Sequence, residues 1–143
     1  MKIQIIISYL DFFIIEKVRE LRIRATPYMD QVTLAQHLGL SEGYIGNIEN
    51  PKIRSKYNIR MLTRIAEALN LDSYKYFFPE DVLKYDLVKI CLDLKKVSTR
   101  KHEMDGEGNI VKRFEVLSIT PLSQEEKEAW KRNALNYLTV IEK

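Results

Sequence analysis

The stretch that decides the fold is "LAQHLGLSEGYIGNIEN", residues 34–50. Its apolar residues recur at helical spacing in two short segments, and Gly39 lies between them. Helices often end at a glycine in the left-handed conformation, because a residue with a Cβ is strained there. We therefore expect a helix that begins after Asp30, a tight turn at Gly39, and a second helix over residues 41–50 that Ser41 caps.

The sequence on either side of this pair also has helical spacing. "DFFIIEKVRELRIR", residues 11–24, places apolar residues on one helix face, and Asp11 is its expected N-cap. "NIRMLTRIAEALNL", residues 58–71, is amphipathic in the same way, and residues 72–78 allow a short fifth turn. The sequence thus predicts a domain of five short helices over residues 11–79.

The two segments joined at Gly39 resemble the helix-turn-helix of phage repressors, the Cro/repressor or XRE-type family. The resemblance covers residues 12–78, about half the chain. Ala35 supplies the small residue needed where the two helices touch. The apolar residues that hold the angle between the helices are Leu34, Leu38, Leu40, Ile45 and Ile48. The resemblance implies that helix 41–50 enters the major groove of DNA.

The same resemblance implies which residues of this helix face the bases. They are Glu42, Gly43, Tyr44, Gly46 and Asn47. The Asn47 amide can pair with adenine and the Glu42 carboxylate with cytosine, whereas the family commonly has amide or basic readers at positions 42 and 43. Each glycine costs a helix about 1 kcal/mol relative to alanine. Close approach of the backbone to DNA, or packing between helices, would each account for Gly46.

Contacts with phosphates and a structural ion pair are further implications of the resemblance. The phosphate-contacting positions are Gln31, at the start of the first helix, and Asn50, Lys52, Arg54 and Lys56, in the following loop. These contacts place a protein on DNA and make its affinity depend on salt, but they do not read sequence. The ion pair would join Arg22 to Glu49.

Residues 80–143 resemble no family that we recognise, and we expect a small α+β appendage there. Residues 95–120 predict a β-hairpin around "DGEGN", whose Asp-Gly and Gly-Asn dipeptides tolerate positive φ. Ser123 and Glu126 form a capping box for a C-terminal helix. Residues 1–10 are an extension that could form a strand. The expected fold class is therefore mainly α, a five-helix helix-turn-helix domain followed by this appendage.

Composition narrows the classes of function. The chain has 143 residues, of which 45% are hydrophobic and 30% charged, as in ordinary globular proteins. Its net charge of +3 comes entirely from residues 1–79. Its one cysteine forms no intramolecular disulfide, and the apolar N-terminus is too short to span a bilayer. We expect a cytoplasmic protein without membrane contact, catalytic residues, cofactor or metal site.

Three functions remain open from the sequence. The leading one is a sequence-specific regulator of transcription that binds double-stranded DNA, a dimeric repressor that dimerises through residues 80–143. In that dimer, the side chains buried against the symmetry mate would be Phe114, Trp130 and Tyr137. The alternative is an antitoxin-like or accessory protein whose residues 80–143 bind a partner protein. The third is a sensor of a small ligand.

The hairpin has a second possible role, as a wing that contacts the DNA backbone. Its basic residues are Lys95, Lys96, Arg100, Lys101, Lys112 and Arg113. Residues 80–143 are electrically neutral overall, so dimerisation is the favoured role for this region.

Overall fold

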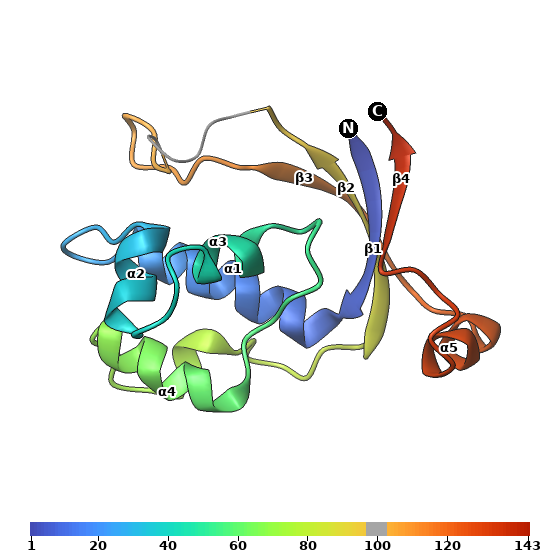
Figure 1. Ribbon diagram of the computed structural model, residues 1–143, viewed down its shortest axis with the longest axis horizontal. Helices are drawn as coiled ribbons and strands as arrows, with labels where there is room; N and C mark the ends of the chain where they lie inside the picture. Colours follow the sequence, from blue (N-terminus) through green and yellow to red (C-terminus); the bar gives the residue numbers. More distant parts are fainter. Residues whose placement is uncertain (97–102) are drawn as a thin grey trace.

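The computed structural model describes residues 1–96 and 103–143. Within these residues the chain forms five α-helices, a short 3-10 helix and a four-stranded antiparallel sheet. Four of the helices gather beside the sheet, and two long arms of the sheet reach across them (Figure 1). The expected fold class, mainly α, is therefore wrong. The protein is α+β, because strands from both ends of the chain combine into one sheet.

The helical part contains four α-helices and one 3-10 turn where five helices were expected. They are α1 (Tyr9–Ile23), α2 (Gln31–His37), α3 (Tyr44–Glu49), α4 (Ile59–Ala68) and the 3-10 helix η1 (Tyr74–Phe77). As expected, Asp30 caps α2, and its Oδ1 accepts a hydrogen bond from the Thr33 amide at 2.7 Å. Asn58 caps α4 in the same way through the Met61 amide, at 2.9 Å.

Two of the expected helix caps are wrong. Helix α1 begins at Tyr9, and Ser8 caps it by accepting a hydrogen bond from the amide of Asp11, the residue expected to be the cap. The strand before α1 runs directly into the helix, which moves its start toward the N-terminus. Helix α3 begins at Tyr44, later than expected from Ser41, and no side chain caps it.

The sheet joins the two ends of the sequence. Its strands are β1 (Lys2–Ser8), β2 (Leu87–Leu94), β3 (Phe114–Pro121) and β4 (Leu138–Glu142), in the order β3-β2-β1-β4. Ile5 of β1 lies opposite Ile90 of β2 on one side and Leu138 of β4 on the other. The expected N-terminal extension is thus an inner strand of the sheet, and β4 was not expected at all.

Two apolar clusters form the core. The first lies among the helices and includes Leu34, Ala35, Ile45, Ile65 and Phe77, all of which are fully buried. The second lies on one face of the sheet, where the buried residues are Ile3, Ile5, Val88, Ile90, Leu92 and Phe114. Ile7 packs against both clusters and so connects the helical part with the sheet.

The last helix, α5 (Gln124–Lys131), begins with the expected capping box. The Ser123 hydroxyl accepts a hydrogen bond from the Glu126 amide at 3.2 Å, and the Glu126 carboxylate accepts one from the Ser123 amide at 2.9 Å. After α5, Asn133 has a positive φ of 57°, and the chain turns toward β4. Phe114 is buried, whereas Tyr137 is half-buried against the second cluster, so the Phe114 ring is covered within the chain and the Tyr137 ring is covered in part.

The turn expected at "DGEGN" is present, but the hairpin expected over residues 95–120 is placed differently, because the strand that pairs with β3 is β2, Leu87–Leu94. Asp105 Oδ1 accepts hydrogen bonds from the Glu107 and Asn109 amides, and Gly108 has a φ of +84°. A bridge between Met104 and Ile110 closes this tip. Of the basic residues expected to form a wing, Arg100 and Lys101 lie outside the described residues. We use the term hairpin tip for residues 103–113.

Candidate nucleic-acid interface

The turn between α2 and α3 has the geometry expected at Gly39. Its φ is +67°, in the left-handed region that favours glycine. The Leu40 amide donates to the Ala35 carbonyl at 3.0 Å, which closes the end of α2. Arg64 of α4 donates a hydrogen bond to the carbonyl of Leu38. The two helices are therefore held at a fixed angle by the turn and by α4 beneath it.

The residues expected to face DNA bases differ in exposure. Glu42, Gly43 and Asn47 are exposed, whereas Tyr44 and Gly46 are half-buried. The Tyr44 ring packs against the helical core, so most of its surface serves packing. The free polar groups on this face are therefore the Glu42 carboxylate and the Asn47 amide.

Gly46 leaves room for the side chain of Gln31. A Cβ at position 46 would lie 3.0 Å from Gln31 Oε1. The Gln31 amide crosses α3 there and donates to Glu49 Oε1 at 3.0 Å. Helix packing thus accounts for Gly46. Gln31, for which the resemblance implied a phosphate contact, has its amide directed toward Glu49.

Arg22 and Glu49 form the expected ion pair, and a second carboxylate joins it. Arg22 Nε and Nη2 donate to the two Glu49 oxygens at 3.0 and 2.8 Å. Arg22 Nη1 and Nη2 also donate to Glu103 at 2.7 and 2.5 Å, and Nη1 donates to the Met29 carbonyl at 2.9 Å. Tyr28 donates a further hydrogen bond to Glu103. All five donors of the Arg22 guanidinium face acceptors in a fully buried site.

The charges of this cluster shift the pKa values of its members. Burial alone would raise the pKa of Glu103, but hydrogen bonds from Arg22 and Tyr28 outweigh it and lower the pKa below 4.5. Burial, together with the hydrogen bond to Glu103, raises the pKa of Tyr28 to about 12. At neutral pH, Glu103 is therefore an anion that accepts three hydrogen bonds, two from Arg22 and one from Tyr28.

Arginines fasten the rest of the hairpin tip to the helices. Arg19 of α1 donates to the Val111 carbonyl at 3.1 Å. Arg113 pairs with Glu16 and donates to the Glu49 carbonyl. Neither Glu103 nor Arg113 could be assigned to this site in advance, because no local pattern shows which carboxylate of a distant hairpin will meet a buried arginine.

The expected phosphate-binding loop is tied to neighbouring elements. Asn50 Oδ1 accepts from the Lys52 amide at 3.0 Å, and Lys56 pairs with Asp11 at 3.6 Å. The Arg54 guanidinium lies 4.6 Å from the centre of the Trp130 ring in α5. The four loop side chains, Asn50, Lys52, Arg54 and Lys56, are exposed, whereas Asp11 and Trp130 are half-buried. The structure therefore leaves Lys52 in the open and places Arg54 against an aromatic ring.

A hollow lies beside the exposed face of α3. It is lined by Asp30, Gln31, Val32, Glu42, Gly43, Gly46, Asn47 and Glu103. Three of these eight residues are acids, and none is lysine or arginine. A phosphate group entering this hollow would meet negative charge, so an approaching duplex would need its cationic contacts from the loop 50–56.

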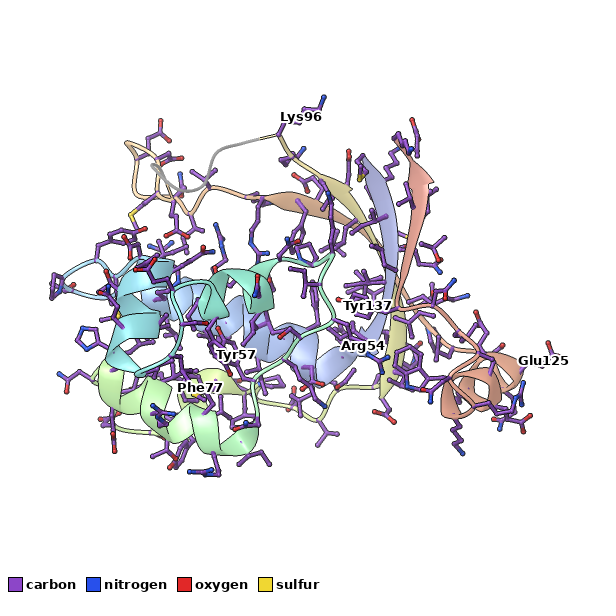
Figure 2. All side chains as sticks on the ribbon, viewed as in Figure 1. Arg54, Tyr57, Phe77, Lys96, Glu125 and Tyr137 are labelled. Atoms are coloured by element: carbon purple, nitrogen blue, oxygen red, sulfur yellow. The ribbon has the colours of Figure 1, made fainter. Side chains whose placement is uncertain are left out.

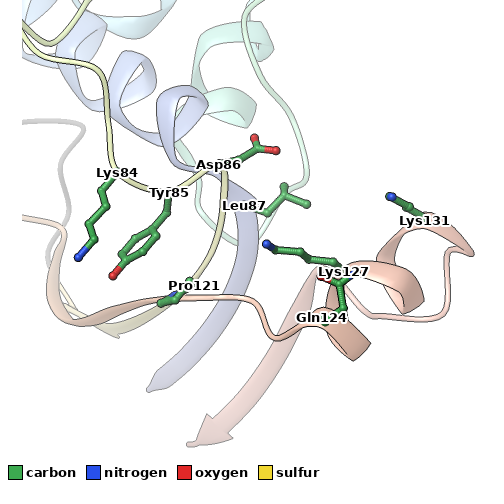
Figure 3. Close-up of a pocket in the computed structure, with 8 residues that line it drawn as sticks. All are labelled: Lys84, Tyr85, Asp86, Leu87, Pro121, Gln124, Lys127 and Lys131. Carbon is green, nitrogen blue, oxygen red and sulfur yellow. The ribbon is translucent and has the colours of Figure 1, made fainter.

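A second hollow lies where α5 meets the start of β2, and it contains more lysines. Its charged residues are Lys84, Asp86, Lys127 and Lys131. Figure 3 shows that the three ammonium groups do not point to a common centre. This hollow therefore lacks the convergent donors that would hold a phosphate.

Neither a metal site nor a membrane-spanning helix finds support in the described part of the chain. Residues 1–96 and 103–143 contain no group of three or more His, Cys, Asp or Glu residues placed to hold a metal. In the same residues, no helix combines the length and the apolar character needed to cross a membrane. Comparisons of the chain with protein-family models, with curated proteins and with solved structures found no match.

Proposed function

We propose that this protein is a sequence-specific regulator of transcription, a dimeric repressor of the phage-repressor helix-turn-helix class that inserts residues 41–50 in the major groove. The observation that supports the proposal most is the α2–Gly39–α3 unit. It presents Glu42 and Asn47 on one exposed face, with Asn50 and Lys52 exposed just beyond it. In this arrangement Asn47 reads adenine and Lys52 binds a phosphate.

Selection of bound duplexes from a random pool, repeated at two salt concentrations, tests this function. The expected result is enrichment of an inverted repeat whose half-sites lie about one helical turn apart, with an affinity that falls as salt rises. Absence of salt-sensitive binding to any duplex would refute the proposal.

Two matched pairs of variants separate base reading from phosphate binding. Asn47→Ala should reduce the free-energy preference for one base at a single position of the site by about 1–3 kcal/mol. Gln36→Ala removes an exposed amide on α2 and should leave this base preference unchanged. Lys52→Ala should lower the log–log salt slope by about 1, unlike Lys127→Ala on α5. A loss of the same size in both members of a pair would contradict the assigned role.

The dimer that this function needs would form along the free edge of β4. Among the residues that the structure describes, this strand pairs with β1 alone, on its inner side, and it exposes Val140 and Ile141, at 46% and 53%. The other edge strand, β3, ends at Pro121, which cannot donate a backbone hydrogen bond. We expect Val140→Lys with Ile141→Lys to give a monomer in sedimentation, and Leu117→Lys on β3 to leave the dimer intact.

The acidic hollow favours a second function, the antitoxin-like or accessory protein. Asp30, Glu42 and Glu103 would suit the lysine or arginine side chains of a partner protein better than a phosphate. Glu42→Gln separates the two functions. In a DNA-binding regulator this change removes a repulsion and should strengthen binding to the selected duplex. In the accessory protein neither form binds DNA.

A further inference from the structure

We propose that the cleft between the loop after α3 and helix α5 binds a small organic monoanion, an aromatic carboxylate, that acts as an effector. The cleft has a volume of about 370 Å³. Four separate parts of the chain form it, namely the junction of β1 with α1, the loop 54–56, the start of β2 at Leu87, and the segment from α5 to β4. The side chains of Arg54 and Tyr137 lie near each other at this junction (Figure 2).

The lining has the composition of a small-molecule site. Ile6, Ile7 and Leu87 provide an apolar floor, and the rings of Trp130 and Tyr137 provide aromatic walls. Its volume falls within the range of about 300–1,000 Å³ that is usual for ligand pockets, which combine apolar walls with a few polar groups. The lining therefore suits a ligand whose body is flat and apolar.

The charges of the cleft select an anion. The charged residues of the lining are Arg54, Lys56 and Asp11, and Asp11 pairs with Lys56 at 3.6 Å. One positive charge, that of Arg54, is left without a carboxylate partner among the residues of this lining. A ligand with a single negative charge would neutralise it.

Arg54 is positioned to bind a carboxylate. Its guanidinium lies over the Trp130 ring, with the central carbon 4.6 Å from the ring centre. A guanidinium that places its flat face on an aromatic ring keeps the N–H donors at its edge free for a bidentate contact. The aromatic body of the ligand would then extend over the apolar floor, between Tyr137 and Ile7.

One wall of the cleft, the Tyr137 ring, is held in place without a ligand. The Tyr137 hydroxyl donates to the Pro51 carbonyl at 2.9 Å, and the Ile6 amide donates to the Tyr137 carbonyl at 3.0 Å. These bonds fix one aromatic wall against both the loop and β1. A preformed site binds more tightly, because little side-chain ordering is needed on association.

The regulatory part of this inference rests on the proposed function and on the phosphate contact that the family resemblance implies for Arg54. One guanidinium cannot serve a ligand carboxylate inside the cleft and a phosphate outside it at the same time. The effector should therefore weaken DNA binding. By thermodynamic linkage, DNA should weaken binding of the effector by the same factor.

Trp130 is the single tryptophan of the chain, so its fluorescence reports on this cleft directly. The probes are benzoate and cinnamate, with benzamide and cinnamamide as neutral compounds of the same shape. We expect a saturable fluorescence change with at least one acid at millimolar concentration or below, and binding at least tenfold weaker for its amide. The site is refuted if neither acid gives a saturable change, or if acid and amide bind equally.

Two variants assign the binding to Arg54. Arg54→Met keeps an unbranched apolar stem and should weaken binding of the acid at least tenfold. Lys52→Met removes a charge from the same loop but outside the cleft, and it should leave binding of the acid unchanged. Equal effects of the two would refute a specific role for Arg54. Urea denaturation of both variants verifies that each is folded.

A DNA titration with saturating acid tests the regulatory part separately. The expected result is a log–log salt slope lower by about 1, as for the loss of one phosphate contact. If the salt slope were unchanged while Trp130 fluorescence showed that the acid was bound, the regulatory role would be refuted, but the binding site itself would still be supported. If the protein bound the acid but no duplex, the proposed function would fail while the site stood.

Discussion

The hairpin tip should stabilise the helix-turn-helix through one buried carboxylate, and Glu103→Gln tests this. Glu103 is 5% exposed and accepts two hydrogen bonds from Arg22 and one from Tyr28. The substitution keeps the size of the side chain and one acceptor oxygen. It removes the negative charge and replaces the second acceptor with an amide group that faces donors.

The cost can be bounded from the contacts that remain. A hydrogen bond to a charged group contributes about 1.5–3 kcal/mol, and removing one member of a buried ion pair costs about 3–5 kcal/mol when the other is left unpaired. Arg22 is not left unpaired, because Glu49 still accepts two of its hydrogen bonds. We therefore expect Glu103→Gln to lower the free energy of unfolding by about 2 kcal/mol.

Urea denaturation at neutral pH measures this change through the midpoint at constant m. Glu107→Gln is the matched control, since Glu107 is exposed at the same tip, and it should stay within about 0.5 kcal/mol of the wild type. If the two variants were equally stable, Glu103 would not be docked on Arg22.

The pH dependence of the difference provides a second test. The folded protein lowers the pKa of Glu103 below 4.5, so its contribution to stability is complete above that pH. It is lost as the pH falls through the lowered pKa, because the carboxylate of the folded protein is then protonated. The difference in the free energy of unfolding between wild type and Glu103→Gln should therefore become smaller at acid pH. A gap of constant size down to the lowest pH at which both fold would contradict this assignment.

Two further predictions concern the turn and the helix caps. Gly39→Ala should cost about 1–2 kcal/mol in urea denaturation, because it forces a Cβ into a φ of +67°, whereas Gly106→Ala, in open space, should cost less than half of that. Ser123→Ala should cost about 1 kcal/mol by removing a capping box, and Ser41→Ala should be near neutral because no side chain caps α3. Equal costs within either pair would contradict the assigned geometry.

The parts of the fold that depend on nearby residues were predictable. Gly39 marks a turn because its conformation penalises a Cβ, and Ser123 with Glu126 marks a helix start because the capping box needs only residues three apart. The Arg22–Glu49 pair was expected only because the resemblance to phage repressors implied it. Ser41 misled because a serine before an apolar segment also occurs in turns, and the chain here turns once more before α3 begins.

The sheet was not predictable, because strand pairing is a property of distant segments. Ile5 pairs with Ile90 and Leu138, and no pattern within residues 2–8 identifies either partner. Residues 138–142 have only five residues in which to show alternation, and all but one of them are exposed. Glu103 was missed for the same reason, since its partner Arg22 lies 81 residues earlier.

The same long-range pairing leads to a last prediction, that the helices and the sheet unfold together. Ser8 ends β1 and caps α1, Ile7 packs in both apolar clusters, and Arg22 is paired with a carboxylate from each part. If β1 left the sheet together with α1, it would lose its pairing with β2 and β4. Separation of the hairpin tip from the helices would also take the Glu103 carboxylate away from the buried Arg22. Partial unfolding along this boundary should therefore be nearly as costly as complete unfolding.

Native-state hydrogen exchange measures this directly. The most protected amides of β1 and β2 and those of α1 and α4 should exchange with the same free energy, equal to that of global unfolding in urea. Trp130 fluorescence alone would not decide the matter, because α5 can detach locally from Arg54. A helical part whose most protected amides exchanged several kcal/mol below those of the sheet would be a separate unit, and the buried contact between Arg22 and Glu103 would then not couple the two.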